Sequence, residues 1–140
     1  MTVNYSFLTA LHVDAGNQPD MYSLAFCLAD YEGGRLFIAA DGADGYPSPR
    51  RSDGSLAVGE PGSFQDAKSG KAVKGNYYCT KAKIQDEGLA GALFFSGRVQ
   101  HATEAFKGER ICVLWYTHSG VYKIPRLEAP AKLQDQRLEL

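Results

Sequence analysis

Histidine, aspartate and arginine side chains occupy positions that suggest a binding or catalytic site. His12 and Asp14 end an apolar segment that runs from Phe7 to Val13. Because residues two positions apart on a strand point to the same side, we expect the imidazole and the carboxylate to be directed at one point. A hydrogen bond between the two side chains at the surface has the same sequence pattern, so the pair alone does not define a function.

A second histidine and an arginine occur much later, within the segment GRVQHATEAFKGER. His101 lies inside this segment, and Arg110 opens the apolar strand predicted over 111–117. If Arg110 points inward, Cys112 and Leu114 share its face, and its buried guanidinium requires a carboxylate partner. That partner is either an internal Asp or Glu or a carboxylate ligand that the planar guanidinium binds through both oxygens.

Two histidines and one aspartate form the ligand set of non-haem Fe(II) oxygenases, which leaves positions on the metal open. At this point the sequence resembles the 2-oxoglutarate and Fe(II)-dependent dioxygenases. The match covers roughly 11–117, and HATEAFKGERICVLWYT is especially similar to the family's second-histidine segment. The residues that carry the resemblance are, in chain order, His12-Val13-Asp14 as H-x-D, DYEGG at Asp30 to Gly34 as a strand ending in a G-G turn, His101, and Arg110 nine residues later.

The resemblance implies an enzyme with a metal and a co-substrate. It makes His12, Asp14 and His101 the ligands of Fe(II), and Arg110 the partner of the distal carboxylate of 2-oxoglutarate. The expected reaction uses O₂, converts 2-oxoglutarate to succinate and oxidises a C–H group of the substrate. The presence of Asp14 implies hydroxylation or oxidative demethylation. The substrate stays open between a small molecule, a peptide and a nucleobase.

Two other functions are compatible with the sequence. A cupin-type metalloenzyme would use the same His and Asp ligands without 2-oxoglutarate, and it would not need Arg110 as a carboxylate anchor. A non-catalytic jelly-roll binding module is the other alternative. Only 11 residues precede His12, fewer than the family usually has. We therefore expect either a minimal or truncated jelly-roll core, or a homo-oligomer in which a neighbouring subunit covers the sheet on the short N-terminal side.

Other polar side chains near these motifs have less specific patterns. Asn17 is predicted either to orient Asp14 by a hydrogen bond or to form the turn in DAGNQPD. His118, in the turn sequence THSG, is expected to be solvated and not to bind metal. A lysine- and tyrosine-rich segment could follow a phosphate backbone, although a solvated strand face is the commoner origin of such a pattern. Its residues are Lys68, Lys71, Lys74, Tyr77, Tyr78, Lys81 and Lys83.

The elements that position these groups are predicted to be strands. Short apolar runs separated by Gly-, Asp- and Pro-rich turns are typical of an all-β domain with few helices. We count about seven or eight short strands, the number that closes two sheets into a jelly roll. The resemblance implies the double-stranded β-helix form of this cupin-like fold. Strands are expected over 23–30, 35–40, 77–84, 89–95 and 111–117.

The domain organisation predicted from the sequence is simple. A minimal jelly-roll oxygenase domain covers 1–125, and a tail follows over 126–140. The polar stretch 41–75 is expected to be a long loop or lid, because long connections in compact domains are usually functional or mobile. A hairpin is predicted at 118–124.

Composition excludes several classes of protein. The 140 residues carry 15 Lys and Arg against 16 Asp and Glu, and this near-neutral balance argues against a nucleic-acid coat protein or a polybasic membrane binder. No stretch approaches the roughly 18 apolar residues of a membrane span, and no secretory signal is visible, so a cytoplasmic location is expected. Cys27, Cys79 and Cys112 lack paired C-x-x-C spacing and are predicted to be reduced thiols.

Overall fold

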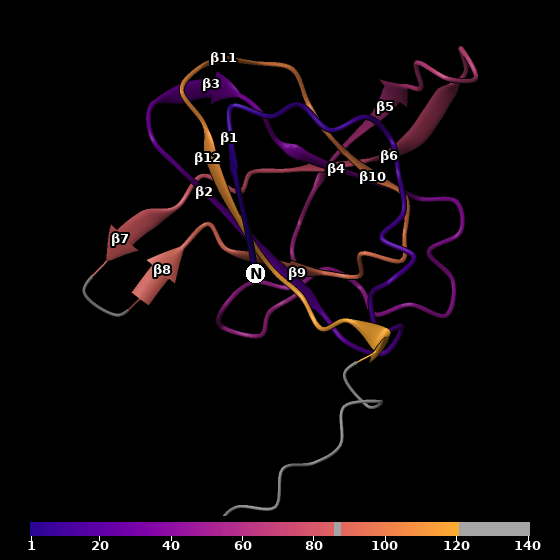
Figure 1. The fold of residues 1–140 in the computed structure, drawn as a ribbon, viewed down its shortest axis with the longest axis horizontal. Coiled ribbons are helices and arrows are strands. Elements are labelled where there is room, and N and C mark those ends of the chain that lie inside the picture. The colour runs from indigo at the N-terminus through magenta and orange to yellow at the C-terminus, as the bar shows by residue number, and fades with distance from the viewer. Residues whose placement is uncertain (86–87, 121–140) are drawn as a thin grey trace, which may run out of the picture.

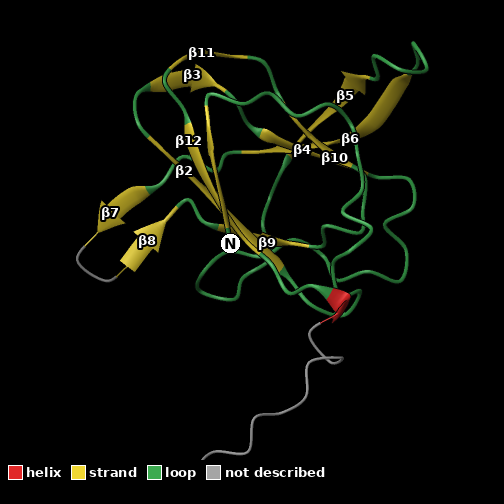
Figure 2. Cartoon of the chain, in the orientation of Figure 1, coloured by secondary structure: helices red, strands yellow, loops and turns green. Residues whose placement is uncertain are grey.

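The computed structural model describes residues 1–85 and 88–120, and strands make up nearly all of its regular structure (Figure 1). The described residues contain no α-helix, and a short 3₁₀ turn over 119–120 is the element drawn red in Figure 2. The all-β class predicted from the sequence is confirmed. The strands are β1 (Thr2–Tyr5), β2 (Ser23–Leu28), β3 (Tyr31–Gly33), β4 (Leu36–Ala39), β5 (Glu60–Gln65), β6 (Ala72–Tyr78), β7 (Lys83–Gln85), β8 (Gly88–Ala90), β9 (Leu93–Phe95), β10 (His101–Thr103), β11 (Phe106–Gly108) and β12 (Ile111–Trp115).

Two four-stranded antiparallel sheets form the body of the domain (Figure 1). The first has the strand order β1-β12-β2-β9, and the second has the order β10-β4-β6-β5. Most neighbours in these sheets are far apart in sequence; Thr2 of β1, for example, pairs with Leu114 of β12. Two smaller pairs, β11 with β3 and β7 with β8, extend from the two sheets. This arrangement is a β-sandwich with jelly-roll-like connections.

The main core lies between the two sheets and is built from alternate residues of each strand. In β2 the side chains of Ser23, Ala25 and Cys27 are buried, whereas the residues between them are partly exposed. This is the two-residue period that a sheet with one inward face requires. The largest of three clusters of buried residues consists of Ala25, Leu36, Ile38, Tyr78, Leu93, Phe95 and Val99.

The predicted strands agree with the structure best where the chain stays in one sheet. The segments 23–30, 35–40 and 111–117 are present with shorter bounds as β2, β4 and β12. The strand predicted over 77–84 is wrong, because β6 ends at Tyr78 and the chain then crosses to the other sheet. There the backbone N–H of Ala82 donates to Cys27 of β2 at 2.7 Å.

The strand predicted over 89–95 is divided into β8 and β9. Gly91 separates them with a φ of 89°, a left-handed conformation that favours glycine. A Cβ atom at this position would lie 2.1 Å from the carbonyl oxygen of Lys81. The break therefore lets two segments of backbone approach closely, which an uninterrupted strand would not permit.

The polar stretch 41–75, expected as one long loop, contains β5 and the beginning of β6. The sequence EPGSFQ did not predict β5, because it contains Pro and Gly, which are both depleted in strands. The β5–β6 register places Phe64 opposite Val73, and the intervening turn is closed by the Asp66 carboxylate, which accepts hydrogen bonds from backbone N–H groups at 3.1 and 3.2 Å. Within 41–75, the residues outside the named strands are therefore 41–59 and the turn 66–71. The predicted tail over 126–140 and most of the predicted hairpin at 118–124 lie outside the described residues.

Candidate metal centre

His12, Asp14 and His101 come together between the two sheets. The segment Phe7 to Val13 is not the regular strand that was predicted, but its backbone runs beside β10. The N–H of His12 donates to the carbonyl of His101 at 3.0 Å, and the N–H of His101 donates back to His12 at 2.9 Å. This two-way pairing brings the imidazole rings side by side, with their centroids 4.3 Å apart.

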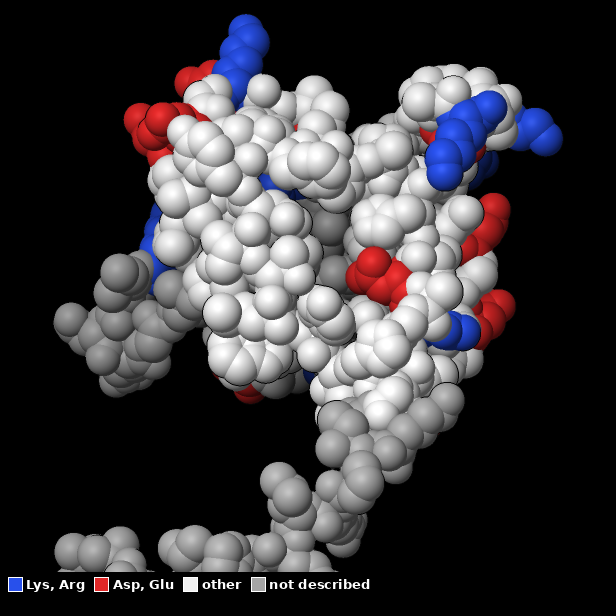
Figure 3. Space-filling view, in the orientation of Figure 1, with Lys and Arg blue, Asp and Glu red and all other residues white. Residues whose placement is uncertain are grey.

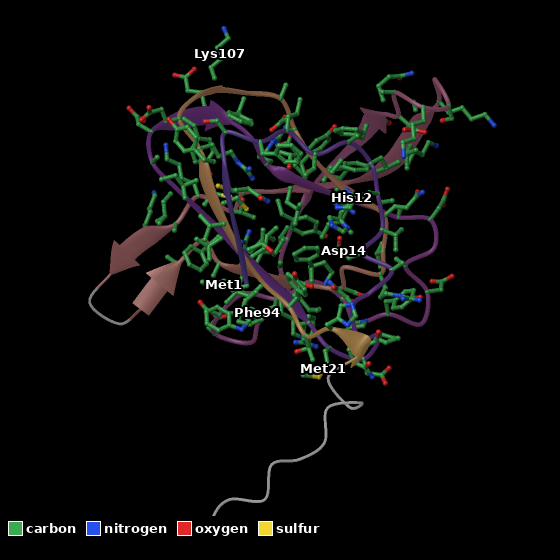
Figure 4. The ribbon with its side chains drawn as sticks, viewed as in Figure 1. Met1, His12, Asp14, Met21, Phe94 and Lys107 are labelled. Carbon is green, nitrogen blue, oxygen red and sulfur yellow. The ribbon has the colours of Figure 1, made fainter. Side chains whose placement is uncertain are left out.

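The carboxylate of Asp14 faces both imidazoles. His12 Nε2 lies 3.4 Å from Asp14 Oδ1, and His101 Nε2 lies 3.5 Å from Asp14 Oδ2. One potential ligand atom from each residue lies within 4.8 Å of the other two. Figure 4 shows the labelled side chains of His12 and Asp14 close together in the interior of the sandwich. Two histidines from neighbouring backbone segments and one carboxylate thus converge as the sequence predicted.

Backbone carbonyls select the tautomer of both histidines. His12 Nδ1 lies 2.8 Å from the carbonyl oxygen of Ala10, and His101 Nδ1 lies 2.8 Å from that of Val99. A carbonyl can only accept a hydrogen bond, so the proton of each neutral ring belongs on Nδ1. Each Nε2 then presents a lone pair toward Asp14. Two lone pairs and a carboxylate repel one another unless a cation lies among them, and metal-ligating histidines are typically held by such a second hydrogen bond.

The ionisation of these groups agrees with a cation-binding site. Burial raises the pKa of Asp14, but in the absence of a metal a protonated Nε2 can donate to the carboxylate, and such hydrogen bonds from His101 and His12 outweigh burial and hold that pKa well below its usual range. The hydrogen bond with Asp14 raises the pKa of His12, while burial acts in the opposite direction. The carboxylate is consequently ionised across the physiological range and attracts either a proton on His12 or a metal ion.

Asn17 and Gly97 fix the position of the Asp14 carboxylate. Asn17 is 6% exposed, and its Nδ2 donates to Asp14 Oδ2 at 3.4 Å and to Ser23 Oγ at 3.1 Å. The backbone N–H of Asp14 donates to the carbonyl of Gly97 at 2.8 Å. A Cβ atom on Gly97 would lie 2.5 Å from Asn17 Nδ2 and 2.9 Å from Asp14 Oδ2. Asn17 therefore takes the orienting role that was one of its two predicted alternatives, whereas sequence analysis did not identify Gly97.

Arg110 is buried without a carboxylate partner. Its side chain is 3% exposed, and no Asp or Glu among the described residues forms an ion pair with it. Its Nε atom has no hydrogen-bond partner in that part of the chain. The guanidinium carbon lies 5.7 Å from the centre of the Tyr31 ring and 5.6 Å from that of Phe106, within the range of cation–π attraction. The predicted alternative of an internal salt bridge is therefore not observed in the described residues.

A glycine and two cysteines lie close to Arg110. Gly34 has a φ of 66°, and a Cβ atom there would lie 3.0 Å from both Cδ and Nε of Arg110, so the predicted G-G turn packs directly on the arginine. Cys27 and Cys112 are buried free thiols that occupy paired positions on β2 and β12. The Cys112 thiol, the Thr80 hydroxyl and the charge of Arg110 lower the pKa of Cys27 against the effect of burial. The positive field of Arg110 is thus directed into the interior, where no carboxylate of the described residues neutralises it.

The three potential ligands and Arg110 share one cavity of about 380 Å³ between the sheets. This volume lies within the range of small-molecule sites. Cys112 and Leu114 line the cavity together with Arg110, as the two-residue period predicted. Figure 3 shows a hollow in this face of the molecule. The other lining residues are Thr2, Asn4, Phe7, Thr9, Gly16, Asn17, Ser23, Ala25, Leu36, Thr80, Phe95, Thr103, Tyr116 and His118.

The remaining candidates from the sequence do not join the ligand group. His118 is exposed and lines the cavity, but its Nδ1 accepts a hydrogen bond from the N–H of Gly120 at 3.0 Å. Lys81 donates to the carbonyl of Tyr31 at 3.0 Å. The four other lysines of the lysine- and tyrosine-rich segment are exposed. This distribution matches a solvated strand face.

Comparisons with known proteins identify no relative of the chain. It matches no protein-family model, no curated protein and no solved structure. Across residues 1–85 and 88–120 there is no helix with the length and apolar character needed to cross a membrane. The geometry of the cavity is accordingly the basis for a functional proposal.

Proposed function

We propose that the chain is a 2-oxoglutarate- and Fe(II)-dependent oxygenase that hydroxylates or oxidatively demethylates its substrate. One observation carries the proposal: a His-Asp-His group whose Nε2 and carboxylate oxygen atoms face one another shares a cavity with a buried arginine that has no carboxylate partner among the described residues. Either feature alone has a simpler explanation. Together they provide the two anchors that an iron ion and a 2-oxo dicarboxylic acid require.

The residues of the group fit a bound Fe(II). His12 and His101 would supply imidazole nitrogens and Asp14 a carboxylate oxygen, a set that leaves several positions on the metal open. The hydrogen bonds from Nδ1 to the carbonyls of Ala10 and Val99 would hold both rings in the required orientation. The iron, when bound, would supply the activation of O₂ that couples decarboxylation of 2-oxoglutarate to oxidation of a C–H bond.

Arg110 fits the distal carboxylate of 2-oxoglutarate. A guanidinium binds both oxygens of a carboxylate in parallel, and burial strengthens the attraction because water does not screen it. The rings of Tyr31 and Phe106 lie next to each other beside the guanidinium, and Gly34 leaves room for the stem of the side chain. The chain thus orients the co-substrate through Arg110 and excludes water from its far end.

The arrangement of the strands supports a double-stranded β-helix. If the segment 9–12, which pairs with β10, is counted as a strand, four strands lie in each sheet: β1, β12, β2 and β9 in the first, and 9–12, β10, β4 and β6 in the second. Eight strands in two sheets are the number of a jelly roll. The strand β5 is an addition at the outer edge of the second sheet. In this scheme the ligands lie on the paired segments 9–14 and β10.

Binding measurements distinguish this proposal from the two alternatives. Under anaerobic conditions Fe(II) or Mn(II) should raise the melting temperature of the wild type but not of His12→Ala, because a ligand that binds only the folded state stabilises it. Adding 2-oxoglutarate to the metal-loaded wild type should raise the melting temperature further, and Arg110→Met should abolish that second increase alone. Metal binding without a 2-oxoglutarate effect would favour a cupin-type metalloenzyme. No metal binding by a folded protein would favour a binding module.

A further inference from the structure

The sheet β1-β12-β2-β9 has two faces of different character. Its inner face lines the cavity with residues such as Asn4, Ser23 and Cys112. The register of the strands places the alternate residues together on the opposite face. Every one of these outward positions is apolar. They are Val3, Tyr5, Leu24, Phe26, Leu28, Phe94, Ile111, Val113 and Trp115, which we call the outer apolar face.

Much of the outer apolar face is in contact with solvent in the described chain. The exposed fractions are 56% for Val3, 63% for Tyr5, 59% for Trp115 and 36% for Leu28. Figure 3 shows the surface over β1 and β12 almost free of charged atoms, which gather at its edges. An antiparallel sheet with one solvated face normally carries polar residues there. A continuous apolar face of this kind marks an interaction site.

The second sheet shows how the same chain covers an apolar outer face. Phe37 of β4 is fully buried, and it packs against Phe64, Val73 and Tyr77 of the β5–β6 hairpin. The ring of Phe37 lies 5.3 Å from that of Phe64, with the two planes nearly parallel. No described segment covers the first sheet in this way. The described residues therefore leave the outer face of the first sheet open to a second molecule.

We propose that the outer apolar face binds a second copy of this chain, sheet against sheet about a twofold axis. A twofold interface brings the same patch of both subunits together, and a face without charge meets its own copy without repulsion. The hydroxyl of Tyr5 is already bonded to Glu109 at 2.8 Å. A nucleic acid or an acidic peptide would find no opposite charge on this face. This inference does not depend on the proposed enzymatic function.

The exposed area reaches the lower limit expected for a dimer. With about 200 Å² for a large side chain, the four most exposed residues present roughly 430 Å². The five partly exposed neighbours raise this to about 600 Å² in each copy, so a dimer would bury about 1,200 Å² in total, the lower limit for stable specific interfaces. Facing sheets pack about 10 Å apart through interdigitated side chains, which suits the aromatic and branched residues of this face.

The single tryptophan reports directly on this interface, because Trp115 lies within it. Sedimentation of the full chain over a wide range of concentrations should show a shift from 15.2 kDa to twice that mass. The emission of Trp115 should move to shorter wavelength over the same range of concentrations as the side chain loses contact with water. The cavity lies against the inner face of the sheet, so metal binding should not change with dimerisation.

Charged substitutions at two distant points of the face complete the test. Val3→Glu on β1 and Leu28→Glu on β2 should each weaken association at least ~10-fold, since an unpaired charge would be buried in the interface. Val58→Glu is the matched control, because Val58 is 90% exposed and lies outside the face. Circular dichroism establishes that the variants fold. A wild type that stays monomeric at every concentration, or a dimer that neither Val3→Glu nor Leu28→Glu weakens, would overturn the proposal.

Discussion

Replacing Gly97 by alanine should damage the proposed metal centre, although none of its candidate ligands is itself replaced. A Cβ atom on Gly97 would lie 2.5 Å from Asn17 Nδ2 and 2.9 Å from Asp14 Oδ2. An ordinary contact of 3.4 Å requires the amide to retreat by about 0.9 Å and the carboxylate by about 0.5 Å. Because Asp14 is held by His12, His101 and Asn17, it cannot move without losing those contacts. The φ of Gly97 is not positive, so alanine introduces no backbone strain there.

The expected effect on metal affinity follows from the role of orienting groups. Displacing the partner of a metal ligand typically costs 10- to 100-fold in affinity, or about 1.4–2.7 kcal/mol. Crowding a packed interior also costs about 1–3 kcal/mol of folding free energy. We therefore expect Gly97→Ala to bind Mn(II) at least ~10-fold more weakly than the wild type and to remain folded.

Anaerobic calorimetric titration with Mn(II) measures this effect, with Gly62→Ala as the matched control. A Cβ atom on Gly62 of β5 would lie 2.7 Å from the Tyr77 ring, a comparable degree of crowding, and Gly62 does not line the cavity. The control should lose stability to urea but keep its affinity for Mn(II). Equal Mn(II) affinities for Gly97→Ala, Gly62→Ala and the wild type would refute the claim that the position of Asp14 sets metal binding.

Three further substitutions test the surroundings of the site. Arg110→Met should leave the urea midpoint unchanged or higher, because it removes a buried charge that has no carboxylate partner; a loss of more than about 3 kcal/mol would reveal an internal partner. Gly34→Ala should lower stability by about 1–2 kcal/mol through its left-handed φ and weaken 2-oxoglutarate binding, with Mn(II) affinity as the unchanged reference. Arg35 donates hydrogen bonds of 2.7 and 2.8 Å to the Glu104 carboxylate and so lowers the pKa of Glu104 below 4.5. The stabilisation of the folded state by this pair is therefore complete above pH 4.5, and it is lost as the pH falls through the lowered pKa of the folded state. Glu104→Gln should therefore be about 1 kcal/mol less stable than the wild type at neutral pH, and a difference that does not shrink on acidification would contradict this assignment.

The sequence identified the candidate ligands and Arg110, but not the residues that hold these side chains in position. The H-x-D spacing placed His12 and Asp14 on one side of the backbone, and the family resemblance, not the spacing, predicted that His101 joins them. The long-range backbone pairing that brings His101 to His12 was not predicted. The apolar strand after Arg110 indicated that this side chain is buried. Such local patterns are readable because the two-residue period of an extended chain determines which side chains share a face.

The features that sequence analysis missed depend on contacts between distant segments. Tyr31 and Phe106 both lie beside Arg110 because β3 pairs with β11. Neither segment has a sequence pattern that predicts this pairing. Gly97 appears in the sequence as an ordinary turn residue, and only the folded chain brings Asn17 and Asp14 against it. The strand β5 was missed for a related reason, since its partner β6 and not its own composition holds it in the sheet.

The most direct test of the central claim is the formation of succinate from 2-oxoglutarate in air with Fe(II) and ascorbate, comparing the wild type with His12→Ala. His12 is partly exposed, so its removal should leave the fold intact, which circular dichroism verifies. Even without the substrate, an oxygenase is expected to turn over 2-oxoglutarate slowly in an uncoupled reaction. We expect succinate from the wild type and none above background from the variant. Equal succinate formation by both proteins, or none from a wild type shown to bind the metal and 2-oxoglutarate, would contradict it.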